Sequence, residues 1–195
     1  MAAATMHDEA AVELVAYDPG WPARFAQERA LLEQALGHWL AGPIEHIGST
    51  AIPGMHAKPV IDIMAPVAGL DAARPAIAAA EATGYVHYPY CADVMHWFCK
   101  PSAAHRTHHL HLVPYGSRLW QERLAFRDCL RGDDALAAEY GALKAALAQR
   151  HRTDREAYTD AKGPFVARVL ARCRRVDAGN ANPSQRVLRP HKEPQ

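Results

Sequence analysis

The sequence lacks a long apolar run, because no stretch approaches the roughly 18–20 consecutive apolar residues that cross a bilayer. Its first residues, MAAATMHDEAAVEL, lack the basic region and apolar core of a signal peptide. The formal net charge is only +1, so charge alone favours neither nucleic acid nor an anionic membrane as a partner. We therefore expect a cytoplasmic protein that does not contact a membrane.

The sequence also lacks closely spaced cysteines. The four cysteines, Cys91, Cys99, Cys129 and Cys173, lie far apart and include no C-x-x-C pair. This spacing gives no zinc-finger signal and predicts free thiols in a reducing compartment.

No internal repeat divides the chain, and 195 residues are enough for one domain with a real core. We expect that domain over 12–176, after a flexible N-terminal tail over 1–11. From 177–195 the pattern loses its periodicity and becomes rich in polar residues, which predicts a disordered tail. The tail has scattered basic residues but no interleaved aromatic residue, so we do not expect nucleic acid as a partner.

Two patterns of apolar residues follow one another along the domain. Apolar and β-branched runs predict strands at 12–16, 44–47, 59–64, 85–88, 94–100 and 107–113. Helical spacing predicts helices at 22–39, 71–82, 119–131, 136–151 and 155–175, with caps at Asp71, Ser117, Asp133 or Asp134, and Thr153 or Asp154. We expect an α/β (α+β) fold, with a mixed sheet flanked by helices over 12–116 and a helical part over 117–176.

The segment over 44–67 holds the first candidate site. Gly48, Ser49 and Thr50 form a tight turn after an apolar strand, where backbone N–H groups and a hydroxyl can bind an anion. Asp62 follows inside the apolar run VIDIM, and a carboxylate is costly to bury there without a partner. Asp62 and Ser49 are therefore candidate catalytic residues, although a structural turn and a buried acid paired with a cation explain the same pattern.

Histidines on a later strand form a second candidate site. Alternation along THHLHLV places His109 and His111 on one face of the strand and His108 on the other. If this strand lies beside the strand of Asp62, the three side chains His109, His111 and Asp62 converge on one divalent metal ion, Mg, Mn or Zn. His46, next to the turn, is a further candidate. The alternative is that these histidines only make hydrogen bonds.

Four basic residues stand on otherwise apolar or well-defined elements. They are Lys58, Arg127, Lys144 and Lys162. Together they could bind the phosphate groups of a ligand, or each could lie on a solvated helix face. Their spacing does not decide between these two interpretations.

Several runs, taken together, resemble the GrpB family, also called UPF0157. The run IEHIGSTAIPGMHAKPVIDIM resembles the family signature, and YDPGWPARFAQER resembles its N-terminal segment. Further matches follow in the family's order: GY at 84–85, HHLHLV at 108–113, LAFRDCLR at 124–131, AAEYGALKAALAQR at 137–150 and DREAYTDAKGPFVARVL at 154–170. The resemblance covers about 12–172, and several ordered motifs make it specific.

This resemblance implies a nucleotidyltransferase-like fold, and related domains are fused to some dephospho-CoA kinases. Gly48 and Ser49 match the glycine-serine turn of that superfamily, and Asp62 matches its first carboxylate. Catalysis with two metal ions requires a second carboxylate two residues later. Met64 occupies that position here, and the family usually has an apolar residue there.

Three functions remain open at this point. The first is a nucleotidyltransferase-like protein that binds a nucleotide or another phosphorylated small molecule and assists transfer with one metal ion. The second is a non-catalytic module that binds a nucleotide or a CoA-like ligand. The third is a metal-dependent phosphohydrolase, which needs only one activated water.

Overall fold

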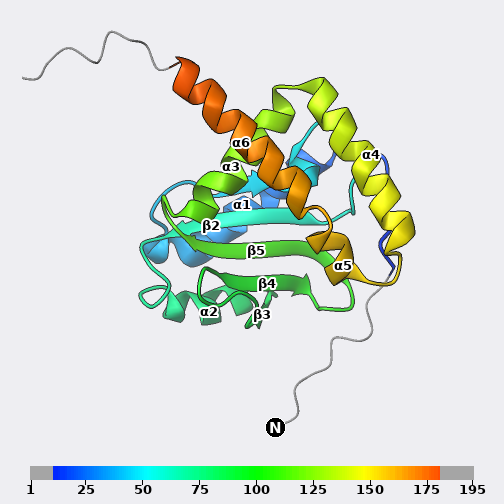
Figure 1. Ribbon diagram of the computed structural model, residues 1–195. Helices are drawn as coiled ribbons and strands as arrows, with labels where there is room; N and C mark the ends of the chain where they lie inside the picture. Colours follow the sequence, from blue (N-terminus) through cyan, green and yellow to red (C-terminus); the bar gives the residue numbers. More distant parts are fainter. Residues whose placement is uncertain (1–10, 181–195) are drawn as a thin grey trace, which may run out of the picture.

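A single mixed sheet forms the centre of the computed structural model, which describes residues 11–180 (Figure 1). Its strands are β1 (Glu45–Ile47), β2 (Ile61–Val67), β3 (Val86–Tyr88), β4 (His96–Pro101) and β5 (Arg106–Pro114). They lie in the order β1-β2-β5-β4-β3. The β2–β5 pair is parallel, and the other neighbours are antiparallel. The predicted mixed sheet is confirmed.

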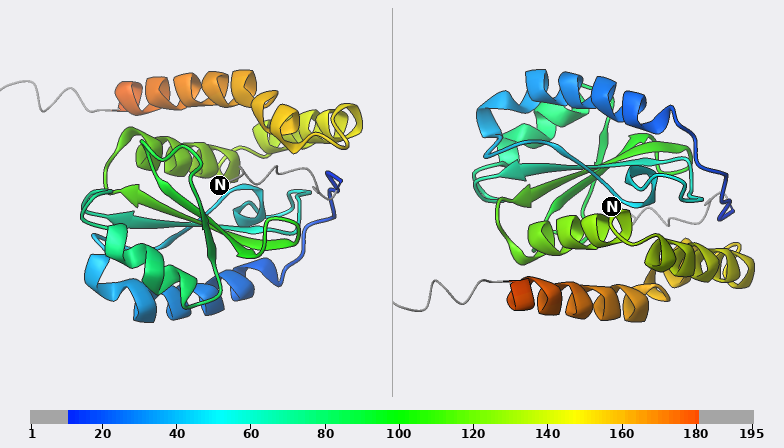
Figure 2. Two further views of the ribbon diagram at one scale, coloured as in Figure 1. Left: turned by 90° about the horizontal axis from the view of Figure 1, so that it is seen from below. Right: turned by 90° about the horizontal axis from the view of Figure 1, so that it is seen from above.

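Helices cover both faces of this sheet (Figure 2). They are α1 (Trp21–Leu36), α2 (Arg74–Glu81), α3 (Arg118–Arg131), α4 (Asp134–Arg150), α5 (Arg155–Asp160) and α6 (Gly163–Asn180), with short 3-10 helices η1 (Gly37–Trp39) and η2 (Ser49–Ala51). Helices α1 and α2 cover one face, while α3 covers the other and α6 lies outside α3. The expected α/β fold with a helical C-terminal part is confirmed.

The alternation of side chains along β2 decides which way Asp62 points. Ile61, Ile63 and Ala65 are buried with the side chains of α1 and α2. Met64 is buried in a different cluster with Trp97 and Trp120, on the α3 side of the sheet. Because successive strand residues face opposite ways, Asp62 lies on the same face as Met64. The apolar sequence of β2 therefore directs one carboxylate toward α3 and α6.

Helix caps were predicted with mixed success. Ser117 and Asp133 accept hydrogen bonds from Trp120 N (3.3 Å) and Leu136 N (2.9 Å), as expected. The prediction for Asp71 is wrong: α2 begins only at Arg74 and has no side-chain cap. A proline in the first turn suits that start, because its missing N–H would have no helical partner. Asp71 instead pairs with the side chain of Arg74 at 3.1 Å.

Two predicted elements are also wrong. The segment over 12–16 makes only a single bridge, between Val15 and Ala57, and no strand. The helix predicted over 155–175 is two helices, because α5 ends at Asp160 and α6 begins at Gly163. Pro164 has no N–H to donate to a preceding carbonyl, so one continuous helix is disfavoured there. Lys162 consequently lies in the link between two helices rather than on a helix face.

The cysteines correct the expectation of four free thiols. Cys129 of α3 and Cys173 of α6 form a disulfide with a Cα–Cα distance of 6.6 Å. They are 44 residues apart, and their proximity arises only from helix packing, which spacing alone does not reveal. Cys91 and Cys99 are free.

The ends of the chain are only partly described. Helix α6 continues to Asn180, past residue 176 where we expect the domain to end. The rest of the two predicted tails, 1–10 and 181–195, lies outside the described residues. Among the described helices, none combines the length and the apolar character needed to cross a membrane.

Candidate functional site

Parallel pairing of β2 and β5 brings the predicted carboxylate and histidines together. The register places Asp62 opposite His109 and Met64 opposite His111. The Nδ1 atom of His109 lies 2.9 Å from Oδ1 of Asp62, and Nε2 of His111 lies 3.9 Å from the same oxygen. One ligand atom from each residue lies within 4.8 Å of the others. The predicted convergence of Asp62, His109 and His111 is confirmed as geometry.

Both imidazoles keep one buried nitrogen without a hydrogen bond. The Nε2 atoms of His109 and His111 are buried and have no hydrogen-bond partner among the described residues. The Nδ1 of His109 contacts Asp62, and the Nδ1 of His111 lies 3.3 Å from the sulfur of Met95. If each Nδ1 carries the proton, each Nε2 holds a lone pair available to a cation. Buried polar atoms normally have partners, so this arrangement fits a site for a bound ion.

The protonation states agree with that arrangement. Burial alone would raise the pKa of the Asp62 carboxyl, but the hydrogen bond from His109 and the proximity of both imidazoles hold it well below its usual range. Burial lowers the pKa of His111 to about 4, so this imidazole is neutral near pH 7. An ionised carboxylate beside a neutral imidazole is the form in which both groups bind metals.

The glycine of the turn is required by its contact with Asp62. Gly48 has φ +71°, a region that side chains other than glycine rarely adopt. A Cβ atom at Gly48 would lie 2.2 Å from Oδ2 of Asp62. Only glycine therefore allows the turn to approach the carboxylate so closely.

Ser49 and Thr50 have different environments within the same turn. The hydroxyl of Thr50 is buried, donates to the carbonyl of Val60 at 3.2 Å and lies 3.0 Å from Nε2 of His46. Ser49 borders a cavity, as does Tyr140 of α4. Ser49 can thus meet a ligand with its side chain, whereas Thr50 can offer only its backbone.

His46 does not belong to the site. It lies opposite Ile63 in the β1–β2 register, so its side chain points to the α1 side of the sheet. Its ring stacks on Phe25, with centroids 4.6 Å apart. The suggestion of His46 as a further candidate is wrong, because alternation along β1 turns it away from Asp62.

A cavity of about 1480 Å³ lies between the sheet and the helices α3 to α6. With the exception of His46, every site residue predicted from the sequence borders it: Gly48, Ser49, Thr50, Lys58, Asp62, His109, His111, Arg127, Lys144 and Lys162. These residues come from distant segments, so their shared cavity reflects the fold rather than local sequence.

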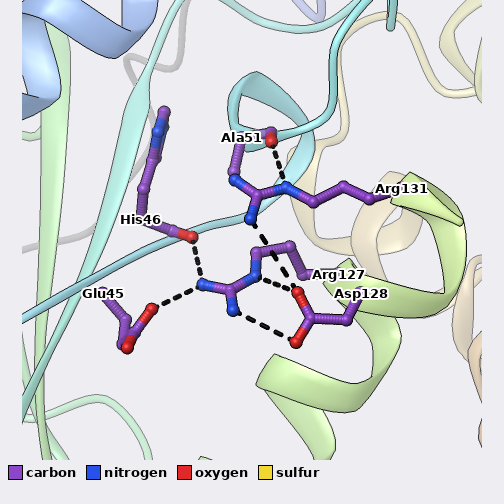
Figure 3. Close-up of polar contacts among 6 residues, drawn as sticks. All are labelled: Glu45, His46, Ala51, Arg127, Asp128 and Arg131. Atoms are coloured by element: carbon purple, nitrogen blue, oxygen red, sulfur yellow. Dashed lines mark hydrogen bonds and ion pairs between the residues drawn. The ribbon is translucent and has the colours of Figure 1, made fainter.

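Arg127 takes part in a group that we call the arginine clamp, formed by Arg127 and Arg131 of α3 (Figure 3). Arg127 donates to Glu45 at 2.7 Å, to the carbonyl of His46 at 3.0 Å and to Asp128 at 2.7 Å. Arg131 donates to the carbonyl of Ala51 at 2.8 Å. The clamp fixes α3 to β1 and η2, on both sides of the Gly48–Ser49 turn.

We call the remaining predicted cations, Lys58, Lys144 and Lys162, the lysine wall. The Nζ atoms of Lys58 and Lys162 lie 5.3 and 4.4 Å from the ring centroid of Tyr158. Lys144 is only 2% exposed and donates to the carbonyl of His56 at 2.5 Å. Burial and the neighbouring lysines lower the pKa of Lys144 to about 7 and that of Lys162 to about 8.

Charge balance distinguishes the lysine wall from the clamp. Within the described residues, neither Lys144 nor Lys162 makes an ion pair with a carboxylate. Positive charges gathered in a cavity without such partners are typical of a site for an anion.

Some residues around the cavity were not predicted. Arg123 borders it, and its charge adds to burial in lowering the pKa of both Lys162 and His111. Arg123 stands four residues before Arg127, so helical spacing is the signal that could have found it. Tyr88, Tyr90 and Trp97 also border the cavity, and only the strand pairing reveals that they are neighbours.

Met64 occupies the position where a second metal-binding carboxylate would stand. It is fully buried, opposite Glu45 on one side and His111 on the other. Glu45 contributes its carboxylate to Arg127 instead. The geometry therefore offers ligands for one cation at Asp62 rather than for a bridged pair.

Comparison with known proteins identifies close relatives of the whole domain. The sequence model of the family described as GrpB protein matches residues 11–172. A UPF0157 protein of Pseudomonas aeruginosa is 41% identical over 170 residues, which are 85% of this chain and 69% of that one. The crystal structure of the conserved protein GrpB from Enterococcus faecalis has a TM-score of 0.76 and 29% identity, covering 85% of this chain and 99% of that chain. A dephospho-CoA kinase of Mycolicibacterium paratuberculosis is 32% identical, with 80% of this chain matching 44% of that protein.

Proposed function

This chain belongs to the GrpB family, and from its site we propose that it binds a nucleotide or another phosphorylated small molecule beside one divalent cation and assists transfer of the phosphate-linked group. The observation that carries this proposal is the cluster of Asp62, His109 and His111, in which one ligand atom of each residue lies within 4.8 Å of the others and both imidazoles keep a buried Nε2 without a partner. The partial similarity to a dephospho-CoA kinase is consistent with a phosphorylated ligand.

Asp62, His109 and His111 are the residues that would hold the cation. Two imidazoles and one carboxylate suit Zn²⁺ or Mn²⁺ better than Mg²⁺, which prefers oxygen ligands. A divalent cation there would supply Lewis-acid polarisation of a phosphoryl oxygen.

The chain's own residues perform the other tasks. Ser49 and the backbone N–H groups at the start of η2 would orient a phosphate group, because Gly48, Ser49 and Thr50 border the cavity. The lysine wall and Arg123 would neutralise the charge of the ligand. Asp62 has a strongly lowered pKa, so it is ionised and suited to binding a cation rather than to donating a proton.

Metal analysis tests the ligand set. We expect about one equivalent of a transition metal in untreated wild-type protein and little in the His109→Ala/His111→Ala variant. His108→Ala is the matched control, because His108 lies on the opposite face of the same strand. Equal metal content in the wild type and the double variant would remove the proposed site.

Turnover separates transfer from its alternatives. Incubation of metal-loaded protein with nucleoside triphosphates, alone and with acceptor alcohols, followed by phosphorus NMR, distinguishes transfer from release of free phosphate.

The buried Met64 in place of a second acid favours a second candidate function, ligand binding without turnover. In that case Asp62→Asn lowers affinity for the ligand, and no phosphate bond is broken by wild type or variant.

A further inference from the structure

Three aromatic side chains border the cavity beside His109. Tyr88 and Trp97 are directly paired across β3 and β4, with ring centroids 5.7 Å apart. Tyr90 follows β3, and its ring lies 5.8 Å from that of Trp97. The ring of Trp97 lies 5.2 Å from that of His109. We call Tyr88, Tyr90 and Trp97 the aromatic wall.

The aromatic wall is incompletely covered by the protein itself. Tyr90 is 50% exposed although it borders the cavity. The guanidinium carbon of Arg106 lies 5.5 Å from the ring centroid of Trp97, over its face. A half-exposed phenol ring and an arginine held against an indole offer flat surfaces on which another ring can stack.

The cavity therefore has two chemically different walls around Asp62. The lysine wall comes from α4, from the link between α5 and α6, and from the segment before β2. The aromatic wall comes from β3, β4 and the loop between them. A ligand made only of phosphate groups would contact the first wall and leave the ring of Tyr90 exposed.

We propose that the ligand of this cavity is a nucleoside phosphate, whose base stacks on Tyr90, the exposed ring of the aromatic wall, while its phosphate groups meet the lysine wall; Trp97 is only 7% exposed and supports Tyr90 from behind. This inference rests on the proposed function and specifies the ligand class of the same site. Stacking recognises the flat face that every base shares, so the aromatic wall gives a preference for nucleotides over plain phosphates and little selection among bases.

Calorimetric titration of the metal-loaded protein with ATP and with inorganic tripolyphosphate tests this inference. We expect wild-type protein to bind ATP about 10-fold more tightly than tripolyphosphate, the size of one stacked base. Tyr90→Ala should weaken the binding of ATP about 5- to 10-fold and leave the affinity for tripolyphosphate unchanged. Tyr115→Ala is the matched control, because Tyr115 is 57% exposed and is not among the residues that border the cavity.

The outcomes separate this inference from the proposed function. Tight binding of tripolyphosphate without any preference for ATP overturns the nucleoside assignment and leaves a phosphate site. An equal loss of both ligands in Tyr90→Ala also overturns it, because the side chain then acts on the fold rather than on the base. If neither compound binds the metal-loaded wild type, both the proposed function and this inference fail.

Discussion

The arginine clamp and the lysine wall are two groups of cations with opposite surroundings. Each clamp arginine meets backbone carbonyls or carboxylates, and Arg127 alone contacts Glu45, Asp128 and the carbonyl of His46. In the lysine wall, Lys144 and Lys162 border the cavity and make no ion pair within the described part of the chain. Arg127, Lys144 and Lys162 all border the cavity that the Gly48–Ser49 turn also borders, but of these three only Arg127 is paired with carboxylates among the described residues.

The difference shows that paired cations and cations without carboxylate partners have separate roles in this fold. Paired charges stabilise the backbone that surrounds the site, because each is matched by a fixed partner. Charges held together without carboxylates are repulsive and desolvated, which costs stability unless a ligand offsets it. Such a cost is expected where a ligand completes the site, so the two groups should respond to substitution in opposite ways.

Removal of Arg127 should give the largest effect on stability. We expect Arg127→Ala to lower the free energy of unfolding by about 3 kcal/mol, because Glu45 is left partly buried without a partner. Urea denaturation measures this. Arg24→Ala is the control, since Arg24 pairs with Asp18 at 2.8 Å but its side chain is 53% exposed, and exposed pairs contribute below about 1 kcal/mol. Equal losses of unfolding free energy in the two variants would show that the clamp stabilises the fold no more than an exposed ion pair does.

Substitution of Gly48 tests the turn that the arginine clamp flanks. Gly48→Ala places a Cβ 2.2 Å from Oδ2 of Asp62, so we expect a loss of about 2–3 kcal/mol together with loss of bound metal. Gly54→Ala shares the positive φ, +73°, but meets no heavy atom within 4 Å, so it carries the backbone strain alone. Metal analysis and urea denaturation of both variants separate the two causes. If Gly54→Ala loses as much metal as Gly48→Ala, contact with Asp62 is not the reason.

Lys144→Met should change the free energy of unfolding in the opposite direction from Arg127→Ala. At pH 7 we expect its free energy of unfolding to equal or exceed that of the wild type, because a buried cation is removed. The pKa of Lys144 is lowered to about 7, below its ordinary value in the unfolded chain. Between these two values the unfolded state binds more protons, so stability of the wild type rises with pH.

The pH dependence gives this prediction its measurement. From pH 7 to pH 9 the wild type should gain about 2 kcal/mol relative to Lys144→Met, as followed by urea denaturation. Inorganic phosphate should reduce the gain, because a bound anion favours the charged lysine. A parallel pH dependence in both proteins would mean that Lys144 is not desolvated, and the contrast with the clamp would disappear.

The sequence could predict the residues of the site better than their partners. Alternation in HHLHLV correctly placed His109 and His111 on one face, because strand periodicity is a local property. Their meeting with Asp62 depended on the β2–β5 pairing, which the sequence offered only as a condition. Arg127 was grouped with the lysines because its partner Glu45 is 82 residues away, and long-range pairing leaves no local pattern.

Sequence reasoning also assigned phosphate binding to both Ser49 and Thr50, and these two residues test that assignment. We expect Ser49→Ala to lower the affinity for inorganic phosphate about 5-fold with little change in stability, because Ser49 borders the cavity. Thr50→Val should leave phosphate affinity unchanged but lower stability by about 1 kcal/mol, because His46 and the carbonyl of Val60 lose their partner. Calorimetric titration and urea denaturation of each variant measure both quantities. A loss of phosphate affinity in Thr50→Val equal to that in Ser49→Ala would show that the buried hydroxyl positions the turn for the ligand, so that even a fully paired group serves binding.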